Sequence, residues 1–145
     1  PLVHRFKYGG DRRLARRAGC WLAEGHDRPP DDVVLVPVPL HWRRRWKRGY
    51  NRAEWIARGV ADVWQVAVHS QALVRQTHQT SLTSSTRLER AAQLTSTYRG
   101  RPAPPGARAY LVDDVLTTGA TLRACAAALE AAGWQVDGAL VLALA

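Results

Sequence analysis

The last third of the chain has the clearest pattern of hydrophobic and polar positions. An apolar run over residues 109–113 predicts a strand, and residues 115–119 supply the threonine and glycine typical of a turn. Hydrophobic positions at helical spacing predict a helix over 120–132 that ends at Gly133, and residues 136–144 are predicted to form another strand. Strand, helix and strand form a βαβ unit, so we expect a parallel sheet with ligands at the carboxyl ends of its strands.

Two amphipathic helices are predicted in the first half. Asp11 is a candidate N-cap for a helix that runs to residue 24. Its inward-facing positions are Leu14, Ala15, Ala18, Trp21 and Leu22. Asn51, with Glu54 three residues later, has the spacing of a capping box and predicts a second helix start. The inward-facing positions of this second helix are Ile56, Val60, Val63 and Trp64.

Shorter segments complete the predicted order of elements. A buried strand is expected over 33–39, and its prolines fall near its carboxyl end. Another strand is expected over 65–70, a helix from about Ser85, and a loop over 99–108. Helices and strands alternate without an internal repeat, which favours an α/β fold.

Length and composition fit one globular domain that covers residues 1–145. The chain is 46% hydrophobic and 23% charged, and no apolar run approaches the roughly 18 residues of a membrane span, so we expect a soluble, cytoplasmic protein without membrane insertion. Cys20 and Cys125 lie in helix-like patterns and are expected to be small buried hydrophobes. The chain has no methionine and begins with Pro1, so we expect its natural start to lie upstream.

Positive charge is concentrated in the first half of the chain. Residues 1–60 carry a net charge of +8 out of the total of +9. A polyanionic partner is one interpretation of this charge, and a solvated basic face is the other.

The stretch YLVDDVLTTGAT, residues 110–121, joins two opposing chemistries. Asp113 and Asp114 are adjacent, and two unit charges about 4 Å apart repel by roughly 1 kcal/mol in water and roughly 4 near a protein surface. The backbone N–H groups of the Thr-Thr-Gly turn, together with the hydroxyls of Thr117, Thr118 and Thr121, suit a phosphate. A ligand with a phosphate and vicinal hydroxyls, such as a sugar phosphate with Mg²⁺ nearby, satisfies both ends. The alternative is an ordinary strand end whose acids cap the next helix.

This stretch resembles the phosphoribosyl pyrophosphate (PRPP) motif of type I phosphoribosyltransferases. The resemblance implies that Asp113 and Asp114, the candidate catalytic residues, hold the ribose hydroxyls and that residues 117–121 bind the 5-phosphate. Thr117 stands where the members that salvage 6-oxopurines have an acid, so we do not expect that activity. The full set of expected PRPP-binding residues is Asp113, Asp114, Val115, Leu116, Thr117, Thr118, Gly119, Ala120 and Thr121.

A second set of motifs resembles the ComF family, the phosphoribosyltransferase-like proteins of bacterial competence. The recurring pieces K-Y-x-G-D, P-V-P-L, R-G-F-N-Q-A, Q-x-x-L-x-x-x-x-R and the PRPP motif are matched, in that order, by residues 7–11, 37–40, 48–53, 79–87 and 111–121. The resemblance implies a Rossmann-like type I phosphoribosyltransferase fold, with a parallel central sheet flanked by helices.

Three positions depart from the ComF pattern. Tyr50 replaces Phe, Arg52 replaces Gln, and Arg90 stands where the family usually has Asn, which puts the roles of Arg52 and Arg90 in doubt. Members often carry an N-terminal zinc ribbon of paired cysteines; this chain contains none, so no zinc is expected in it.

The basic segment over residues 41–51 alternates cations with aromatic side chains. Its expected contact residues are Arg43, Arg44, Arg45, Lys47, Arg48 and Asn51, and its aromatic residues are Trp42, Trp46 and Tyr50. One interpretation is a clamp on the pyrophosphate of PRPP, and another is a platform for single-stranded DNA. A solvated loop is the third. The histidines His41, His69 and His78 lack metal-ligand spacing and are expected at the surface.

Three functions follow from the ComF resemblance. The first is Mg²⁺-dependent phosphoribosyl transfer to an undetermined acceptor, with Mg²⁺ held through the ligand and not directly by the protein. The second is binding of single-stranded DNA beside a competence helicase, without transferase turnover, and the third is a PRPP-sensing regulator. The sequence contains no nucleobase-recognition motif that decides among them.

Overall fold

A parallel sheet forms the centre of the molecule. The computed structural model describes residues 11–40, 49–76 and 97–145. Within them, β1 (Val33–Pro37), β4 (Arg108–Leu116) and β5 (Gln135–Leu144) are all parallel, in the order β1-β4-β5. A single parallel bridge between Leu35 and Val68 adds a further segment at the β1 edge. The predicted α/β fold with a parallel central sheet is therefore confirmed.

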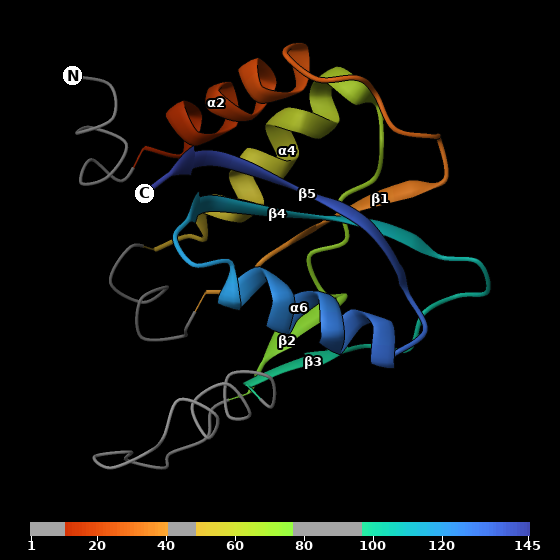
Figure 1. Ribbon diagram of the computed structural model, residues 1–145. Helices are drawn as coiled ribbons and strands as arrows, with labels where there is room; N and C mark the ends of the chain where they lie inside the picture. The colour runs from red at the N-terminus through yellow and green to blue at the C-terminus, as the bar shows by residue number, and fades with distance from the viewer. Residues whose placement is uncertain (1–10, 41–48, 77–96) are drawn as a thin grey trace, which may run out of the picture.

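Helices cover both faces of this sheet (Figure 1). On one face lie α2 (Arg12–Glu24) and α4 (Arg52–Trp64). On the other face lie α6 (Ala120–Ala131) and an antiparallel pair of short strands, β2 (Leu73–Arg75) and β3 (Tyr98–Gly100). The carboxyl ends of β4 and β5 point to the same edge, where α4 and α6 begin.

The period of two along each strand explains why both faces are apolar. Leu35 of β1 and Val112 of β4 are buried against α2 and α4. Their chain neighbours Val36 and Leu111 are buried against α6 and the β2–β3 pair. A strand buried on both faces has continuous hydrophobic character, which is why β1 and β4 were visible in the sequence.

The two helices on the first face pack at very close range. The Asp11 carboxylate accepts from the backbone N–H groups of Arg13 and Leu14, which confirms the predicted N-cap. A Cβ at Gly59 would stand only 1.8 Å from the carbonyl oxygen of Arg16, and one at Gly19 only 2.1 Å from that of Ile56. Glycine at these two positions therefore sets the distance between α2 and α4.

Two predicted core positions on these helices are wrong. Trp21 is 47% exposed and Val63 is 38% exposed, because each lies on the outer edge of its helix. The remaining predicted positions of α4, Ile56, Val60 and Trp64, are buried. Cys125 is buried as expected, whereas Cys20 is only partly buried.

The structure also corrects several element boundaries. The strand expected over 109–113 continues as β4 to Leu116, since Val115 and Leu116 pair with Ala143 and Leu144 of the long strand β5. The turn predicted over 115–119 is thus reduced to residues 117–119.

Other expected elements were wrong or lie outside the described residues. The strand expected over 65–70 contributes only the Leu35–Val68 bridge, and β3 occupies the beginning of the loop expected over 99–108. The helix expected from Ser85 falls within residues 77–96, outside the described residues. None of the helices described by the structure is long and apolar enough to cross a membrane.

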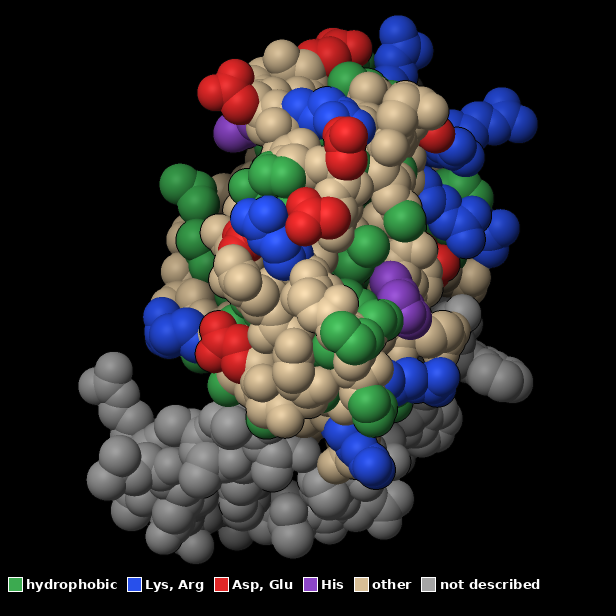
Figure 2. All heavy atoms as spheres, turned by 90° about the vertical axis from the view of Figure 1, so that its right-hand side faces the viewer, with side chains coloured by type: hydrophobic (Ala, Val, Ile, Leu, Met, Phe, Trp, Pro, Cys, Tyr) green, Lys and Arg blue, Asp and Glu red, His purple; other side chains and the backbone are tan. Residues whose placement is uncertain are grey.

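The edge at the amino ends of the strands carries both signs of charge (Figure 2). Arg108 contacts Asp137 at 2.7 Å and Asp32 at 3.4 Å, and Arg28 pairs with Asp31. In the view of Figure 2 acidic and basic side chains are interspersed, so this face does not offer a polyanion one continuous positive surface.

Candidate functional site

The two adjacent acids lie in the last half of β4, near the carboxyl edge of the sheet. The backbone N–H of Asp114 donates to Oδ1 of Asp113 at 2.8 Å, and that of Val115 donates to Oδ1 of Asp114 at 2.9 Å. Each carboxylate is therefore fixed by the peptide that follows it. Both side chains are partly buried, so they are held by the fold and still reach the surface.

The proximity of the two acids changes their protonation. Burial, a hydrogen bond to the side chain of Asp114 and the charge of Asp114 together raise the pKa of Asp113 from 3.8 to about 7. A pKa near neutrality leaves Asp113 uncharged in a large fraction of molecules at pH 7. The uncharged form avoids the repulsion that two ionised neighbours would feel.

Arg52 is a residue of this site that sequence reasoning did not assign. It is the first residue of α4, its side chain is only 6% exposed, and its Nη1 lies 3.9 Å from Oδ2 of Asp114. Within the described residues, Arg52 is the one charged residue in the buried class. The sequence contained one indication of this residue, because Arg52 stands where the family usually has Gln. Its contact with Asp114 became visible only from the packing of α4 on β4.

The loop between β4 and α6 exposes its two threonines to solvent. Gly119 has φ +80°, a left-handed conformation that side chains rarely adopt, and it precedes the first residue of α6. Thr117 and Thr118 are exposed, and the Oγ1 of Thr118 accepts from the backbone N–H of Ala120 at 3.3 Å. The backbone N–H groups at this helix start, with the dipole of α6 behind them, are the groups expected to hold a phosphate, and their contact with an anion stays a prediction.

Arg123 is a second residue that the sequence analysis missed. Its Nη1 lies 2.9 Å from the position that a Cβ on Gly119 would occupy, so its guanidinium lies next to the last residue of the loop. The spacing of four residues from Gly119 places Arg123 one helical turn above the loop, and this spacing was the signal available in the sequence.

The predicted residues thus fall into three groups. Asp113, Asp114, Val115 and Leu116 belong to β4, residues 117–119 form the loop, and Ala120 and Thr121 begin α6. The structure brings these groups together at one edge, and contact of each residue with a ligand stays a prediction. The basic residues Arg43, Arg44, Arg45, Lys47 and Arg48 lie outside the described residues.

Asn51 has a structural task. Its side-chain oxygen accepts from the N–H of Ala53 at 3.2 Å, and its Nδ2 donates to the carbonyl of Val38 at 3.0 Å. The residue therefore caps α4 and ties its start to the end of β1. Glu54 accepts from Ser70 and from Arg58, each at 3.1 Å.

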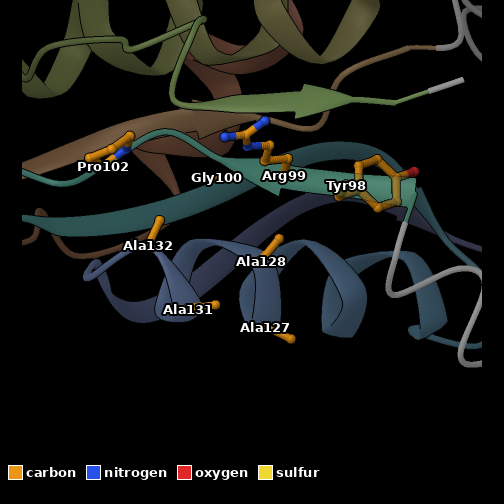
Figure 3. Close-up of a pocket in the computed structure, with 8 residues that line it drawn as sticks. All are labelled: Tyr98, Arg99, Gly100, Pro102, Ala127, Ala128, Ala131 and Ala132. Carbon is orange, nitrogen blue, oxygen red and sulfur yellow. The ribbon is translucent and has the colours of Figure 1, made fainter.

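Two hollows among the described residues differ in their relation to the acids. A polar hollow of about 90 Å³ lies beside Asn51, Glu54 and Ser70, near the carboxyl end of β1. A shallow hollow of about 530 Å³ lies between β3 and the C-terminal half of α6, where Figure 3 shows mainly alanines on the helix side. It contains no acid, so the acid pair is the better candidate site.

The acids do not form a complete metal site by themselves. The described residues contain no group of three or more His, Cys, Asp or Glu side chains able to hold a metal ion. Arg52 places a positive charge beside this pair, since its Nη1 lies 3.9 Å from Oδ2 of Asp114.

A second cluster combines arginines with tryptophans on α2 and α4. The guanidinium carbons of Arg12, Arg16 and Arg58 lie 6.0, 6.0 and 4.5 Å from the centre of the Trp55 ring. Arg17 lies 5.5 Å from the ring centre of the exposed Trp21. We call these residues the Arg/Trp surface: Arg12, Arg16, Arg17, Trp21, Trp55 and Arg58.

Known proteins similar to this chain come from two groups. Competence protein F of Haemophilus influenzae is 31% identical over 132 residues, covering 83% of this chain and 57% of that protein. DNA utilization protein YhgH of Escherichia coli is 30% identical over 129 residues, covering 84% of this chain and 56% of that protein. The chain thus spans about half the length of these curated relatives.

A shorter match comes from an enzyme. Adenine phosphoribosyltransferase of Clavibacter michiganensis is 57% identical over 42 residues, which is 28% of this chain and 24% of that enzyme. No family model matches the chain. The similarity to competence protein F and to YhgH covers most of this chain and agrees with the motifs and the parallel sheet, so the chain belongs to the ComF family.

Proposed function

We propose that this protein binds PRPP or a closely related phosphosugar at the carboxyl edge of its sheet. The observation that carries the proposal is the pairing of two opposite binding chemistries at one edge. The partly buried carboxyl groups of Asp113 and Asp114 accept hydrogen bonds from vicinal hydroxyls, and the open loop over 117–121 receives a phosphate. The short, 57% identical match to an adenine phosphoribosyltransferase supports this assignment.

In the proposed complex each group of residues has one task. Asp113 and Asp114 orient the ribose, while the N–H groups and hydroxyls of residues 117–121 hold the 5-phosphate. Mg²⁺ carried by the ligand would supply charge neutralisation on the pyrophosphate. If turnover occurs, the bond between C1 and the pyrophosphate oxygen breaks, pyrophosphate leaves with the electron pair, and an acceptor nucleophile bonds to C1 and loses its proton.

We further propose that this binding serves the handling of DNA during natural competence. The two relatives whose alignments cover more than four-fifths of this chain are named for competence and for DNA utilization. A competence helicase is the protein partner that this role implies, and the cytoplasm is the proposed compartment.

A direct role in binding single-stranded DNA is the second candidate function, and the Arg/Trp surface favours it. Arg12 and Arg13 stand in the first turn of α2, which contains no acid. Their positive charges oppose the helix dipole, so this end of the helix is strongly electropositive. Exposed Trp21 offers a ring face for a base, and the neighbouring Arg17 offers a cation for the backbone. A PRPP-sensing regulator is the third function, and it shares the same ligand site.

Titration calorimetry with PRPP, with and without Mg²⁺, tests the main proposal. We expect the double variant Asp113→Asn, Asp114→Asn to lose binding and to keep the circular dichroism spectrum of the parent. The double variant Asp31→Asn, Asp32→Asn is the matched control, because it removes two adjacent acids far from the loop and should bind like the parent. Unchanged PRPP affinity in the first variant would disprove the site.

A salt series with labelled single-stranded DNA tests the second candidate. An electrostatic track gives a log–log slope of about −0.7 per phosphate neutralised. Replacement of Arg17 and Trp21 by alanine should flatten the slope and weaken binding, whereas Arg99→Ala, an exposed arginine of β3, should not. A slope near zero in the parent would reject the candidate. Replacing Arg43, Arg44 and Arg45 tests the basic segment in the same assay.

A further inference from the structure

The outer edge of β5 has no neighbouring strand in the described part of the chain. β5 is the last strand in the order β1-β4-β5, and its residues 138–144 include neither a proline nor a charged side chain. Asp137, the one charged residue of β5, is held by Arg108 at 2.7 Å. Sheets normally protect an exposed edge with charges, proline or a bulge, because its unpaired N–H and C=O groups bind other strands. This edge is therefore suited to pairing.

We propose that the outer edge of β5 pairs with β5 of a second copy of this chain, antiparallel and about a two-fold axis. The strand is complementary to itself in this arrangement. With Val141 opposite Val141 of the second copy, Ala139 lies opposite Ala143, and Leu140 lies opposite Leu142. Alternate pairs exchange two hydrogen bonds, so about seven aligned positions give about six to eight bonds, within the roughly 10 ± 5 of a specific interface.

The same register gives a place to the exposed Leu144. Its side chain is 81% exposed, and the period of two puts it on the face where Leu140 and Leu142 pack toward α2 and α4. The position opposite Leu144 in the second copy is Gly138, where a Cβ would lie 3.5 Å from the Tyr110 ring. Glycine leaves that position free, so the Leu144 side chain can lie beside the ring of the second copy and is removed from water.

The charges of α2 provide a second, independent match. Arg12 and Arg13 stand in its first turn, and its last turn contains Glu24 and no basic residue. The helix dipole favours the opposite distribution, with acids at the start and bases at the end. An antiparallel neighbouring α2 would correct this, because the start of each helix would then lie beside the end of the other.

The position of α2 on the sheet supplies that neighbour in the proposed dimer. α2 contacts β5, and Leu22 packs in the same apolar cluster as Leu140. β5 ends near the beginning of α2, so the two elements run in opposite directions (Figure 1). A two-fold axis perpendicular to the joined sheet puts both α2 helices on one face and antiparallel, so Arg13 of each copy approaches Glu24 of the other. The strand and the helix therefore both favour a second copy over a strand of another protein.

Sedimentation equilibrium measures the association. We expect the parent to reach twice the mass of one chain, and Val141→Lys to remain at the mass of one chain because it places two lysines directly opposite each other. Val63→Lys, on the outer edge of α4, is the matched control and should dimerise like the parent. An equimolar mixture of Val141→Lys and Val141→Asp should restore the dimer. A parent that stays at the mass of one chain up to about 1 mM would overturn the proposal.

A charge exchange on α2 tests the two-fold arrangement without altering the strand. Arg13→Glu and Glu24→Lys should each weaken the dimer by about fivefold or more, since each breaks two symmetry-related contacts, and the double variant should restore the parental dissociation constant. The two residues lie about 16 Å apart along one helix, so the rescue has to come from the second copy. A double variant as weak as the single ones, or a dimer that persists in Val141→Lys, would show that another surface is used. If Val141→Lys does not fold, the charge exchange decides.

Discussion

Asp113→Asn should make the protein more stable at alkaline pH, although it removes a residue of the candidate site. The pKa of Asp113 is raised to about 7, mainly by burial and then by its neighbour Asp114, so ionising this group in the folded protein is unfavourable. The difference of about three pKa units from the unfolded chain corresponds to at most about 4 kcal/mol. Because Asp113 remains partly exposed, we expect about 2 to 3 kcal/mol.

The direction in which stability changes with pH follows from proton binding. Between pH 4 and about pH 7 the folded protein keeps the Asp113 proton that the unfolded chain has lost, so the free energy of unfolding falls as pH rises. Above about pH 7 Asp113 is ionised in both the folded and the unfolded state, and the loss of stability caused by its burial is complete. Asparagine has no proton to lose, so the stability of the variant relative to the parent should rise through this window and stay constant beyond it.

Urea denaturation followed by tryptophan fluorescence, at intervals from pH 4 to pH 8.5, measures this difference. Asp62→Asn is the contrasting control. A hydrogen bond from Arg16 lowers the pKa of Asp62, so this carboxylate stabilises the folded state above its unfolded pKa and loses that effect only as pH falls. Its loss should cost a few tenths of a kcal/mol at neutral pH, since the pair is exposed. If Asp113→Asn follows the parent at every pH, the pKa of Asp113 is not raised in the folded protein.

Two further substitutions test the loop and the helix packing. Arg123→Ala should weaken binding of ribose 5-phosphate by roughly fivefold or more and leave binding of ribose unchanged, because the guanidinium lies next to the loop; calorimetry with both ligands checks this, and equal losses would place Arg123 outside the phosphate site. Gly59→Ala should lower the free energy of unfolding by about 3 kcal/mol, since its Cβ meets the Arg16 carbonyl at 1.8 Å, whereas Gly25→Ala, whose nearest atom is 3.7 Å away, should be nearly neutral in urea denaturation.

The parallel sheet could be predicted because β1 and β4 are buried on both faces. Leu35, Val36, Leu111 and Val112 form continuous apolar runs, and such runs between amphipathic helices have few alternatives to a βαβ arrangement. The helix starts were visible for a similar reason, because Asp11 and Asn51 satisfy backbone donors that any helix leaves open.

The short antiparallel strands could not be predicted from local pattern. β2 and β3 have three residues each, and their pairing joins Leu73 to Gly100 across a large separation in sequence. Three residues do not establish a period of two, so the neighbouring proline-rich stretch decided the prediction in favour of a loop. The carboxyl end of β4 was missed because Thr117 and Thr118 suggested an earlier turn, while pairing with β5 extends the strand to Leu116.

Two features inside the protein ease the repulsion between the two acids. The pKa of Asp113 is raised to about 7, so this group is uncharged in a large fraction of molecules at neutral pH, and Arg52 faces Asp114 from the start of α4. Repulsion between the acids therefore does not by itself require an external cation. The evidence for a phosphosugar comes instead from the groups that remain open to solvent at one edge, namely carboxyl oxygens oriented by backbone N–H groups and the exposed hydroxyls of Thr117 and Thr118. A diol and a phosphate on one ligand satisfy both sets, and a bare phosphate or a bare cation satisfies only one.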